Sequence, residues 1–423
     1  MHSVHSTALL TDHYELTMVA AARRAGTAGR RCVFELFSRS LPAGRRYGVV
    51  AGVGRMLEAL PAFRFSESEL AALGSVVDDD TLAWLADFRF TGSIRGYAEG
   101  DLWFAHSPLL VVEASFAEAV VLETLLLSIY NHDCAVAAAA SRMVTAAGSR
   151  PCVEMGSRRT HEEAAVAAAR AAYLAGFTAT SNLAARHRYG VPTTGTAAHA
   201  FTLLHDTEAE AFAAQVTALG VDTTLLVDTY EVEAGVRAAL AAAGPDLGAV
   251  RIDSGDLAEV ARRVRDQLDE AGAPHTRIVA TSDLDEHRIE ALAEAPLDAY
   301  GVGTHLVTGS GHPTAALVYK LVAREDAHGT LAPVAKRSVG KESRGGRKEA
   351  TRRLTDGVAV AEVVGPAPGE GRPLLVDLVR DGEPVGTEAL VDARARHRAA
   401  VAELPAEGRL IAAGDPAIPT LMV

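Results

Sequence analysis

The chain has 423 residues, 48% of them hydrophobic and 22% charged, and this composition is typical of an ordinary soluble globular protein. The length predicts two domains or one large elaborated domain. Because 41 basic residues oppose 54 acidic ones, the formal net charge is −13, which argues against a nucleic-acid binder that relies on bulk positive charge.

The cysteines and the N-terminus indicate the compartment. Cys32, Cys134 and Cys152 form no C-x-x-C pair, so a reducing environment is favoured over a disulfide framework. The first residues lack the basic and apolar regions of a signal peptide. The longest apolar runs, such as 135–140, are far shorter than a membrane span. We therefore expect a cytoplasmic protein with no membrane contact.

The first third of the chain alternates between helical and strand-like patterns. Residues 7–25 predict a strand that enters a helix, with Thr11 or Asp12 as the N-cap and Glu15 in the first turn. The later patterns predict, in order, a strand over 32–37, helices over 49–60 and 66–88, short strands over 89–113 and one long or broken helix over 115–147.

From about residue 150 the pattern changes to alternating strands and helices. Seven candidate strands end near Met155, Thr180, Thr194, Val227, Ile252, Ala280 and Val302. The clearest helix between them covers 257–271. Such alternation predicts parallel βαβ units, and a spacing of about 20 to 30 residues fits a (β/α) barrel. Seven strands rather than eight predict a barrel that is irregular or incompletely closed.

The predicted fold is therefore α/β. An irregular (β/α) barrel over 131–325 is expected to be the catalytic domain. An N-terminal α+β segment over 1–130 and a C-terminal segment over 326–423, with a last helix over 387–403, are expected to pack together as a discontinuous second domain.

Polar side chains follow nearly every predicted barrel strand. In chain order they include Arg158, Ser181, Thr196, His199, Asp228, Asp253, Asp256, Asp283 and Thr304. Barrel enzymes build their active sites at the C-terminal ends of the strands. One polar strand end is explained by helix capping, but six or seven that mix arginine, acids, histidine and Gly-Thr turns indicate a site.

Residues 190–201 read as a short strand that enters a helix, with His199 in the first turn. A helix N-terminus suits phosphate, and an imidazole there can accept a phosphoryl group as a nucleophile. The alternative is a buried, hydrogen-bonded histidine at a strand–helix junction, which this stretch alone favours. The carboxylates, without clustered Cys/His ligands, predict a shared Mg²⁺ whose ligands the sequence does not identify.

All four lysines lie within 29 residues, from Lys320 to Lys348, and segment 336–353 carries eight basic residues against two acidic ones. A compact ammonium suits phosphate, so Lys336 and Lys341 are candidates for a phosphate or ATP loop. A solvated loop or an RNA-contacting one is the alternative.

Eight motifs in collinear order resemble those of nicotinate phosphoribosyltransferase, across nearly the whole chain. They are Thr11-Asp-His-Tyr-Glu-Leu-Thr-Met18, Phe34-Glu-Leu-Phe37, Glu154-Met-Gly-Ser-Arg-Arg159, Gly195-Thr-Ala-Ala-His199, Val227-Asp-Thr-Tyr230, Arg251-Ile-Asp-Ser-Gly-Asp256, Gly301-Val-Gly-Thr304 and Val318-Tyr-Lys-Leu321. The same family includes nicotinamide phosphoribosyltransferase and, more distantly, quinolinate phosphoribosyltransferase.

The resemblance implies that phosphoribosyl pyrophosphate and nicotinate, with ATP as co-substrate and Mg²⁺, give nicotinate mononucleotide for NAD biosynthesis. It implies that ATP phosphorylates His199, that Asp228 orients this imidazole, and that Asp253 belongs to the catalytic group. The substrate-binding residues that it implies are Tyr14, Arg158, Ser181, Thr196, Arg251, Gly303 and Thr304. Tyr14 would reach the pyridine ring from a neighbouring subunit, which implies a homodimer with shared sites.

Ser181 stands where, by resemblance, the nicotinamide enzymes carry aspartate, and a neutral residue there favours a carboxylate substrate. Met155 stands where relatives often place a ring-stacking aromatic. Further departures are Ala179, Ala197 and Ala200. The alternatives are a phosphoribosyltransferase for nicotinamide or another pyridine, and a non-catalytic RNA-binding protein that uses 336–353.

Overall fold

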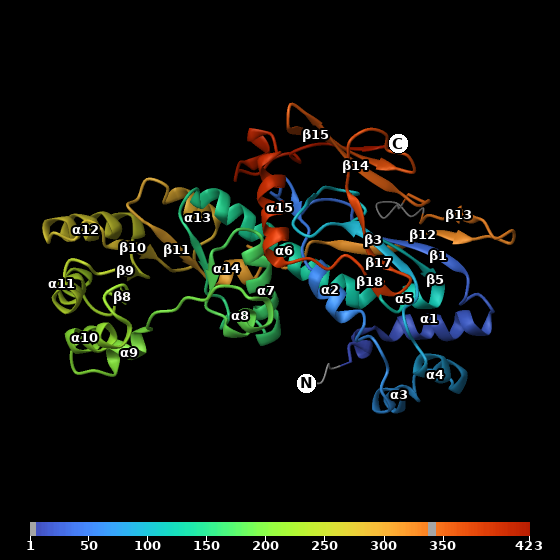
Figure 1. The fold of residues 1–423 in the computed structure, drawn as a ribbon, viewed down its shortest axis with the longest axis horizontal. Helices are drawn as coiled ribbons and strands as arrows, with labels where there is room; N and C mark the ends of the chain where they lie inside the picture. The colour runs from blue at the N-terminus through green and yellow to red at the C-terminus, as the bar shows by residue number, and fades with distance from the viewer. Residues whose placement is uncertain (1–5, 337–343) are drawn as a thin grey trace. The chain divides into compact units, whose positions relative to one another are not determined.

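The computed structural model describes residues 6–336 and 344–423, which form two compact units (Figure 1). The first unit combines Met1–Ala135 with Thr314–Val423, and the second is Val136–Pro313. The discontinuous first unit and the mixed α/β class agree with the predicted fold. The division before residue 136 falls inside one helix, α6 (Glu123–Ala147), as does the predicted boundary after residue 130. The division after residue 313 precedes β12 (Leu317–Glu325), whereas the predicted one follows it.

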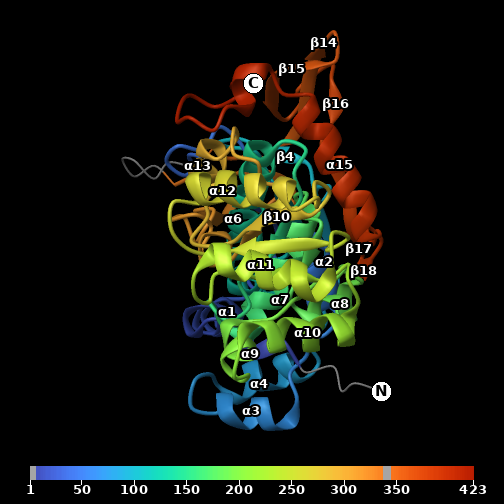
Figure 2. The ribbon, with the colours of Figure 1, turned by 90° about the vertical axis from the view of Figure 1, so that its left-hand side faces the viewer.

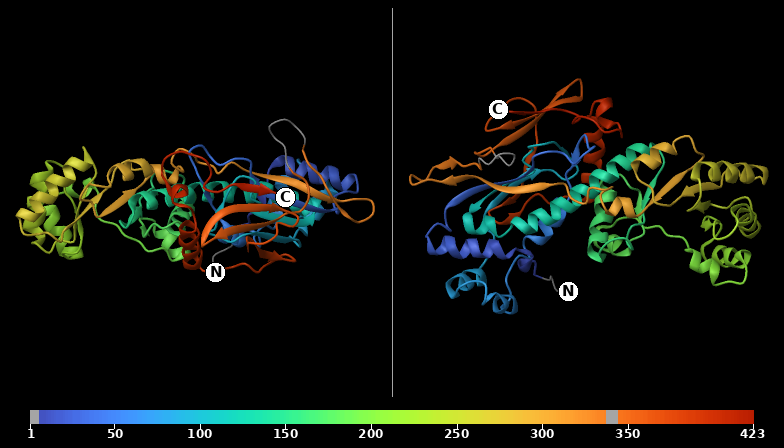
Figure 3. Two further views of the ribbon diagram at one scale, coloured as in Figure 1. Left: turned by 90° about the horizontal axis from the view of Figure 1, so that it is seen from above. Right: turned by 180° about the vertical axis from the view of Figure 1, so that it is seen from behind.

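The first unit is organised around β1 (Arg31–Ser38), which pairs antiparallel with β12 on one side and with β5 (Leu110–Ser115) on the other. The sheet has the order β13-β12-β1-β5-β3-β17-β18. Its other strands are β3 (Ser93–Tyr97), β13 (Leu331–Pro333), β17 (Leu375–Arg380) and β18 (Glu383–Pro384). Figure 3 shows the orange C-terminal strands beside the blue N-terminal ones, so distant parts of the chain complete one sheet.

Two smaller sheets and a set of helices complete the first unit. The sheets have the orders β16-β14-β15-β19 and β2-β4. Their strands are β2 (Gly48–Val49), β4 (Leu102–Trp103), β14 (Glu349–Thr355), β15 (Val358–Gly365), β16 (Arg372–Pro373) and β19 (Thr420–Met422). The helices are η1 (Ala8–Leu10), α1 (His13–Arg24), α2 (Val53–Ala59), α3 (Glu67–Leu73), α4 (Asp79–Ala86), α5 (Phe116–Val120), α15 (Leu390–Ala402) and η2 (Ala406–Arg409).

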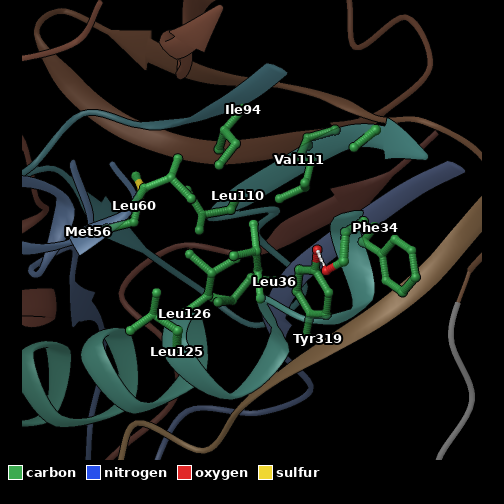
Figure 4. Close-up of a cluster of buried hydrophobic side chains, with 14 of the residues drawn as sticks. Phe34, Leu36, Met56, Leu60, Ile94, Leu110, Val111, Leu125, Leu126 and Tyr319 are labelled. Carbon is green, nitrogen blue, oxygen red and sulfur yellow. Dashed lines mark hydrogen bonds between the residues drawn. The ribbon is translucent and has the colours of Figure 1, made fainter. Parts of the chain in front are cut away.

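The core of the first unit lies between the large sheet and the start of α6 (Figure 4). Phe34 of β1 and Tyr319 of β12 stack with ring centroids 4.9 Å apart, and Leu125 and Leu126 of α6 are buried in the same cluster. Within the described ranges, Phe116–Ala147 is the one helical stretch that is long and apolar enough to cross a membrane, but 67% of its most apolar window is buried. Its apolar length is therefore explained by the protein core.

A buried ion pair explains one lysine of the basic segment. Lys348 Nζ lies 2.9 and 2.7 Å from the two carboxylate oxygens of Glu35, and it also donates to the carbonyls of Arg344 and Gly346. Burial raises the pKa of Glu35 to about 7, against the opposing effect of Lys348. Lys348 is thus a structural cation of the first unit, and Lys320 likewise lies 3.6 Å from Glu123.

A buried histidine in α15 should make stability depend on pH. His397 Nδ1 contacts the Gly100 carbonyl at 3.2 Å, and burial lowers the pKa of His397 to about 4. Since an unfolded histidine titrates near ~6.5, the unfolded chain binds more protons between these two values, and stability falls as the pH drops through that window. The free-energy difference between wild type and His397→Gln should therefore be largest above pH ~6.5 and shrink toward pH ~4 in urea titrations. A constant difference across this range would contradict the prediction.

The second unit holds a six-stranded parallel sheet with the order β7-β6-β11-β10-β9-β8. Its strands are β6 (Cys152–Glu154), β7 (Ala179–Thr180), β8 (Thr224–Leu226), β9 (Ala249–Ile252), β10 (Arg277–Ala280) and β11 (Ala299–Val302). Its helices are α7 (Glu162–Leu174), α8 (Leu183–Tyr189), α9 (His199–Leu203), α10 (Glu208–Leu219), α11 (Val232–Ala243), α12 (Leu257–Glu270), α13 (Glu286–Ala291) and α14 (Thr304–Val307). Helices α10, α11 and α12 lie side by side next to this sheet (Figure 2).

The predicted strand that ends at Thr194 is not a strand. Only Thr193 forms a parallel bridge, to Thr180 at the free edge of β7. Pro192 has no N–H to extend the ladder, and the chain leaves the sheet at the Gly195-Thr196 turn. Six strands plus one bridge give an open, irregular barrel sheet, in agreement with the predicted incomplete closure.

Candidate active site

Because the six strands are parallel, their carboxyl ends share one edge of the sheet. Arg158 follows β6, Ser181 follows β7, Asp228 follows β8 and Asp253 follows β9. Gly303 and Thr304 follow β11 at the start of α14, where Gly303 is the N-cap. The structure thus places these predicted site residues of the second unit along one rim.

His199 lies against Asp228 at this rim. Its Nε2 is 3.9 Å from Asp228 Oδ1, and its Nδ1 is 3.1 Å from Thr229 Oγ1. The Asp228 side chain is 1% exposed, whereas that of His199 is 41% exposed. Asp228 Oδ1 has no hydrogen-bond partner among the described residues. The imidazole is therefore open to solvent on one side and faces an unsatisfied buried carboxylate oxygen on the other.

The other oxygen of Asp228 is firmly held. Oδ2 accepts hydrogen bonds from the Asp253 backbone N–H and from Ser254 Oγ, both at 2.8 Å. Asp253 Oδ1 accepts from Thr281 Oγ1 at 2.5 Å, which joins the ends of β9 and β10. Asp256 instead accepts from the N–H groups of Ala258 and Glu259 and caps α12. Asp228 and Asp253 thus belong to one network, and Asp256 is a helix cap.

Arg251 connects the end of β9 to the Gly195-Thr196 turn. Its Nη1 donates to Thr196 Oγ1 at 2.9 Å, and its Nη2 donates to the Ala197 carbonyl at 3.1 Å. Burial lowers the pKa of Arg251, and the positive charge of Arg158 acts in the same direction, against Asp253 and Asp228. Its buried Nε has no partner among the described residues. A partly desolvated guanidinium with an unused donor, near a second arginine, is suited to bind an anion.

Met155 directly follows β6, and its side chain packs against Gly301 of β11. A Cβ placed on Gly301 would come within 2.7 Å of Met155 Sδ and 2.6 Å of Thr281 Cγ2, so these two side chains occupy the space above Gly301. A Cβ on Gly303 would lie 3.4 Å from the Met155 carbonyl oxygen. The Met155 side chain thus packs over β11 beside Thr281, which follows β10.

Three residues that the sequence did not assign stand out. Thr229 contacts the imidazole of His199. Glu208, at the start of α10, has a buried Oε1 without a partner among the described residues, and its pKa is raised by burial and by the charge of Asp228. Glu154 is fully buried at the end of β6. Thr229 and Glu154 lie inside quoted motifs, but Glu208 had no motif signal at all.

The remaining predicted residues belong to the first unit. Tyr14, on α1, is 44% exposed. Burial raises the pKa of Tyr14, and so does its hydrogen bond to Glu123. Lys336 is exposed at the edge of the described residues, and Lys341 lies outside them. Their predicted roles therefore stay predictions.

No metal centre is preformed in the part of the chain that the structure describes, since no three His, Cys, Asp or Glu side chains gather there at ligand distances. Mg²⁺ often takes only one or two carboxylates and several phosphate or water oxygens. Asp253 fits such a role, because Thr281 donates to its Oδ1 and its Oδ2 accepts no side-chain hydrogen bond within residues 6–336 and 344–423.

A parallel barrel sheet with two arginines, a histidine–aspartate pair and a Gly-Thr turn at one rim defines an enzyme for anionic substrates. Comparison with known proteins gives the family. Residues 9–131 match the nicotinate phosphoribosyltransferase (NAPRTase) N-terminal domain, and residues 151–363 match the nicotinate phosphoribosyltransferase (NAPRTase) family.

Individual relatives agree. The chain is 58% identical to nicotinate phosphoribosyltransferase pncB1 of Mycobacterium tuberculosis, over 97% of this chain and 94% of that protein. It is 38% identical to the Bacillus subtilis nicotinate phosphoribosyltransferase, over 76% and 68% of the two chains. The crystal structure of human nicotinic acid phosphoribosyltransferase matches with a TM-score of 0.84 at 25% identity, over 98% and 97% of the two chains. The chain belongs to the nicotinate phosphoribosyltransferase family.

Proposed function

We propose that this protein transfers phosphoribosyl from phosphoribosyl pyrophosphate to nicotinate and that a phosphohistidine at His199 couples the reaction to ATP. The products are nicotinate mononucleotide for NAD biosynthesis, pyrophosphate, ADP and phosphate. Family membership supports the transfer reaction. The observation that carries the site assignment is the Arg251 guanidinium, partly desolvated and with a free donor, at the same rim as His199 and Asp228.

Arg251 is proposed to bind the nicotinate carboxylate. Its bonds to Thr196 and Ala197 fix the plane of the guanidinium, and Nε remains to donate to the substrate. The pyridine nitrogen then attacks ribose C1 as the C1–oxygen bond to pyrophosphate breaks. Positive charge develops on the sugar and negative charge on the leaving group. Arg158 and the Gly303-Thr304 turn are proposed to contact the phosphates.

His199 is proposed to take the γ-phosphoryl group of ATP. In the expected tautomer Nε2–H faces Asp228 Oδ1, and Nδ1 carries the lone pair that the Thr229 hydroxyl contacts at 3.1 Å. Once that hydroxyl rotates away, Nδ1 attacks the γ-phosphorus, the bond to the bridging oxygen breaks and ADP departs. Water later hydrolyses the phosphohistidine to phosphate and restores the imidazole. Asp228 can orient the ring because its other oxygen is fixed by the Asp253 and Ser254 donors. Mg²⁺, when bound with the phosphates, would neutralise their charge, with Asp253 as the candidate protein ligand.

Tyr14 is proposed to complete the site of a second subunit in a cytoplasmic homodimer, since its ring is exposed on α1. The RNA-binding alternative is less well supported. Lys348 of segment 336–353 is committed to Glu35 inside the first unit, and this removes one cation from any binding surface.

Product analysis tests the proposed function. Nicotinate, nicotinamide and quinolinate are offered in competition, with phosphoribosyl pyrophosphate and Mg²⁺, and with or without ATP. Nicotinate mononucleotide should be the main product, and ATP should increase its yield. Nicotinamide mononucleotide as the main product would instead establish the sister activity.

Ser181→Asp should reverse part of the substrate preference. Ser181 is exposed at the end of β7, so an added carboxylate would repel the nicotinate carboxylate but not an amide. We expect the ratio of kcat/KM for nicotinate to that for nicotinamide to fall about tenfold, which corresponds to ~1.4 kcal/mol of like-charge repulsion. Ser181→Asn is the neutral control of similar size. An unchanged ratio in Ser181→Asp would exclude residue 181 from substrate selection.

A further inference from the structure

Glu154 is a buried carboxylate for which the proposed chemistry has no direct use. It is the last residue of β6 and its side chain is fully buried. Its Oε2 accepts a hydrogen bond from Thr180 Oγ1, and its Oε1 accepts one from the Gly156 backbone N–H. Both oxygens therefore point to the loops that leave the sheet, one after β7 and one after β6.

These hydrogen bonds continue in a ring around the two loops. Thr180 Oγ1 accepts from the Asn182 backbone N–H at 2.9 Å, and Asn182 Nδ2 donates to Ser157 Oγ at 3.0 Å. Asn182 also caps α8 through its Oδ1, which accepts from the Ala185 N–H at 2.9 Å. Starting at Glu154, the ring thus passes through the end of β7 and returns to the loop after β6.

The ring adjoins two of the predicted substrate-binding residues. Ser181 stands between Thr180 and Asn182, both of which are fixed, and its own N–H donates to the Glu154 carbonyl at 2.8 Å. Arg158 follows Gly156 and Ser157, inside a turn closed by the Arg159 N–H and the Gly156 carbonyl at 2.8 Å. The backbone at Ser181 and the backbone that carries Arg158 are therefore both held by hydrogen bonds.

The loop between β11 and α14 also contacts the loop after β6, at Gly156. A Cβ on Gly156 would lie 2.3 Å from Val307 Cγ1 and 3.0 Å from the Gly303 carbonyl oxygen, so the loop after β6 packs directly on the start of α14. The Glu154 carboxylate therefore underlies the loops that carry Arg158, Ser181 and Gly303.

We propose that Glu154 is a positioning residue that, through Thr180, sets the geometry of Ser181 and Arg158 and thereby the discrimination between nicotinate and nicotinamide. The inference rests on the proposed phosphoribosyl transfer to nicotinate. Burial raises the pKa of Glu154, and the hydrogen bonds from Thr180 and Gly156 oppose this shift. Glutamine keeps an acceptor for the Gly156 N–H and can donate to Thr180 Oγ1, but the Thr180 hydroxyl proton then loses its acceptor. Glutamine should therefore preserve only part of the hydrogen-bonded ring.

Thr180→Val is the central variant, because it removes one hydroxyl from the ring and keeps the side-chain shape. We expect the KM for nicotinate to rise about tenfold with kcat changed by less than about threefold, and the nicotinate-to-nicotinamide ratio of kcat/KM to fall by a similar factor. Thr180→Ser, which restores the hydroxyl, should rescue both quantities, and Glu154→Gln should lie closer to wild type than Glu154→Ala. Labelling of His199 by ATP should not change in Thr180→Val, since the His199 imidazole contacts Asp228 and Thr229, which follow a different strand.

Melting temperatures of the variants distinguish a positioning role from a general loss of stability. If Thr180→Val does not fold, Ser157→Ala breaks the ring at its partly exposed bond to Asn182 and should change the same ratio in the same direction. An unchanged ratio in the folded variant would overturn the inference, and so would equal effects of Thr180→Val and Thr180→Ser. A wild-type enzyme that makes no nicotinate mononucleotide would refute the proposed function itself, which is a different outcome.

Discussion

Replacing His199 by alanine should abolish the transfer of phosphate from ATP to the protein. The imidazole lies 3.9 Å from the buried Asp228 Oδ1, and the neighbouring hydroxyls lack its basicity. Wild type incubated with γ-labelled ATP should carry an acid-labile label, whereas His199→Ala should carry none. The nicotinate mononucleotide formed without ATP should be affected much less than the ATP-dependent excess.

The matched control for this variant lies in the same segment of the chain. His205 follows α9, and its Nδ1 contacts the Phe201 carbonyl, away from Asp228. His205→Ala should therefore keep the label. Retention of label in His199→Ala would refute the phosphohistidine assignment, whatever the transferase activity. Loss of label in both variants would instead indicate a folding defect, which circular dichroism would reveal.

Arg251→Ala should lower kcat/KM for nicotinate by about 1.5–3 kcal/mol, or roughly 10- to 150-fold, the range for one hydrogen bond to a charged group. The physical reason is twofold. The substrate carboxylate loses its cation, and Thr196 and the Ala197 carbonyl lose the donors that hold the Gly195-Thr196 turn. The change should appear mainly in KM if the contact is the same in ground and transition states.

Arg262→Ala controls for the loss of an arginine, because Arg262 is exposed on α12 and has no part in the strand-end rim. Arg251→Lys adds a finer comparison. A lysine keeps the charge but cannot donate to Thr196, Ala197 and the substrate with the same planar geometry, so it should recover only part of the loss. Wild-type kinetics in Arg251→Ala would remove Arg251 from the nicotinate site.

The sequence predicted the parallel sheet because its strands are short apolar runs separated by strongly periodic helices. The helix expected over 257–271 is α12, Leu257–Glu270. The prediction of a strand that ends at Thr194 was wrong, since Pro192 interrupts the apolar segment and only a single β-bridge forms. Local periodicity cannot distinguish an edge strand from a bridge, because the difference depends on the partner strand.

Within the site, the sequence located side chains but not their contacts. Asp228, Asp253 and Asp256 look equivalent as acids after strands. The structure distinguishes them. Asp228 Oδ1 has no hydrogen-bond partner among the described residues and lies beside His199, whereas Asp256 accepts hydrogen bonds as the N-cap of α12. Glu208 is brought near Asp228 only by the packing of α10, which no local pattern encodes. Lys348 lies in the basic segment that was predicted to contact phosphate, but it forms an ion pair with Glu35, 313 residues away in the chain.

A crystal structure of the protein with bound nicotinate mononucleotide tests the central claim most directly. The pyridine carboxylate should lie within hydrogen-bond distance of the Arg251 guanidinium, and His199 should lie at the same rim of the parallel sheet. Binding of the nucleotide at a place remote from Arg251 and the strand ends of the second unit would contradict the account.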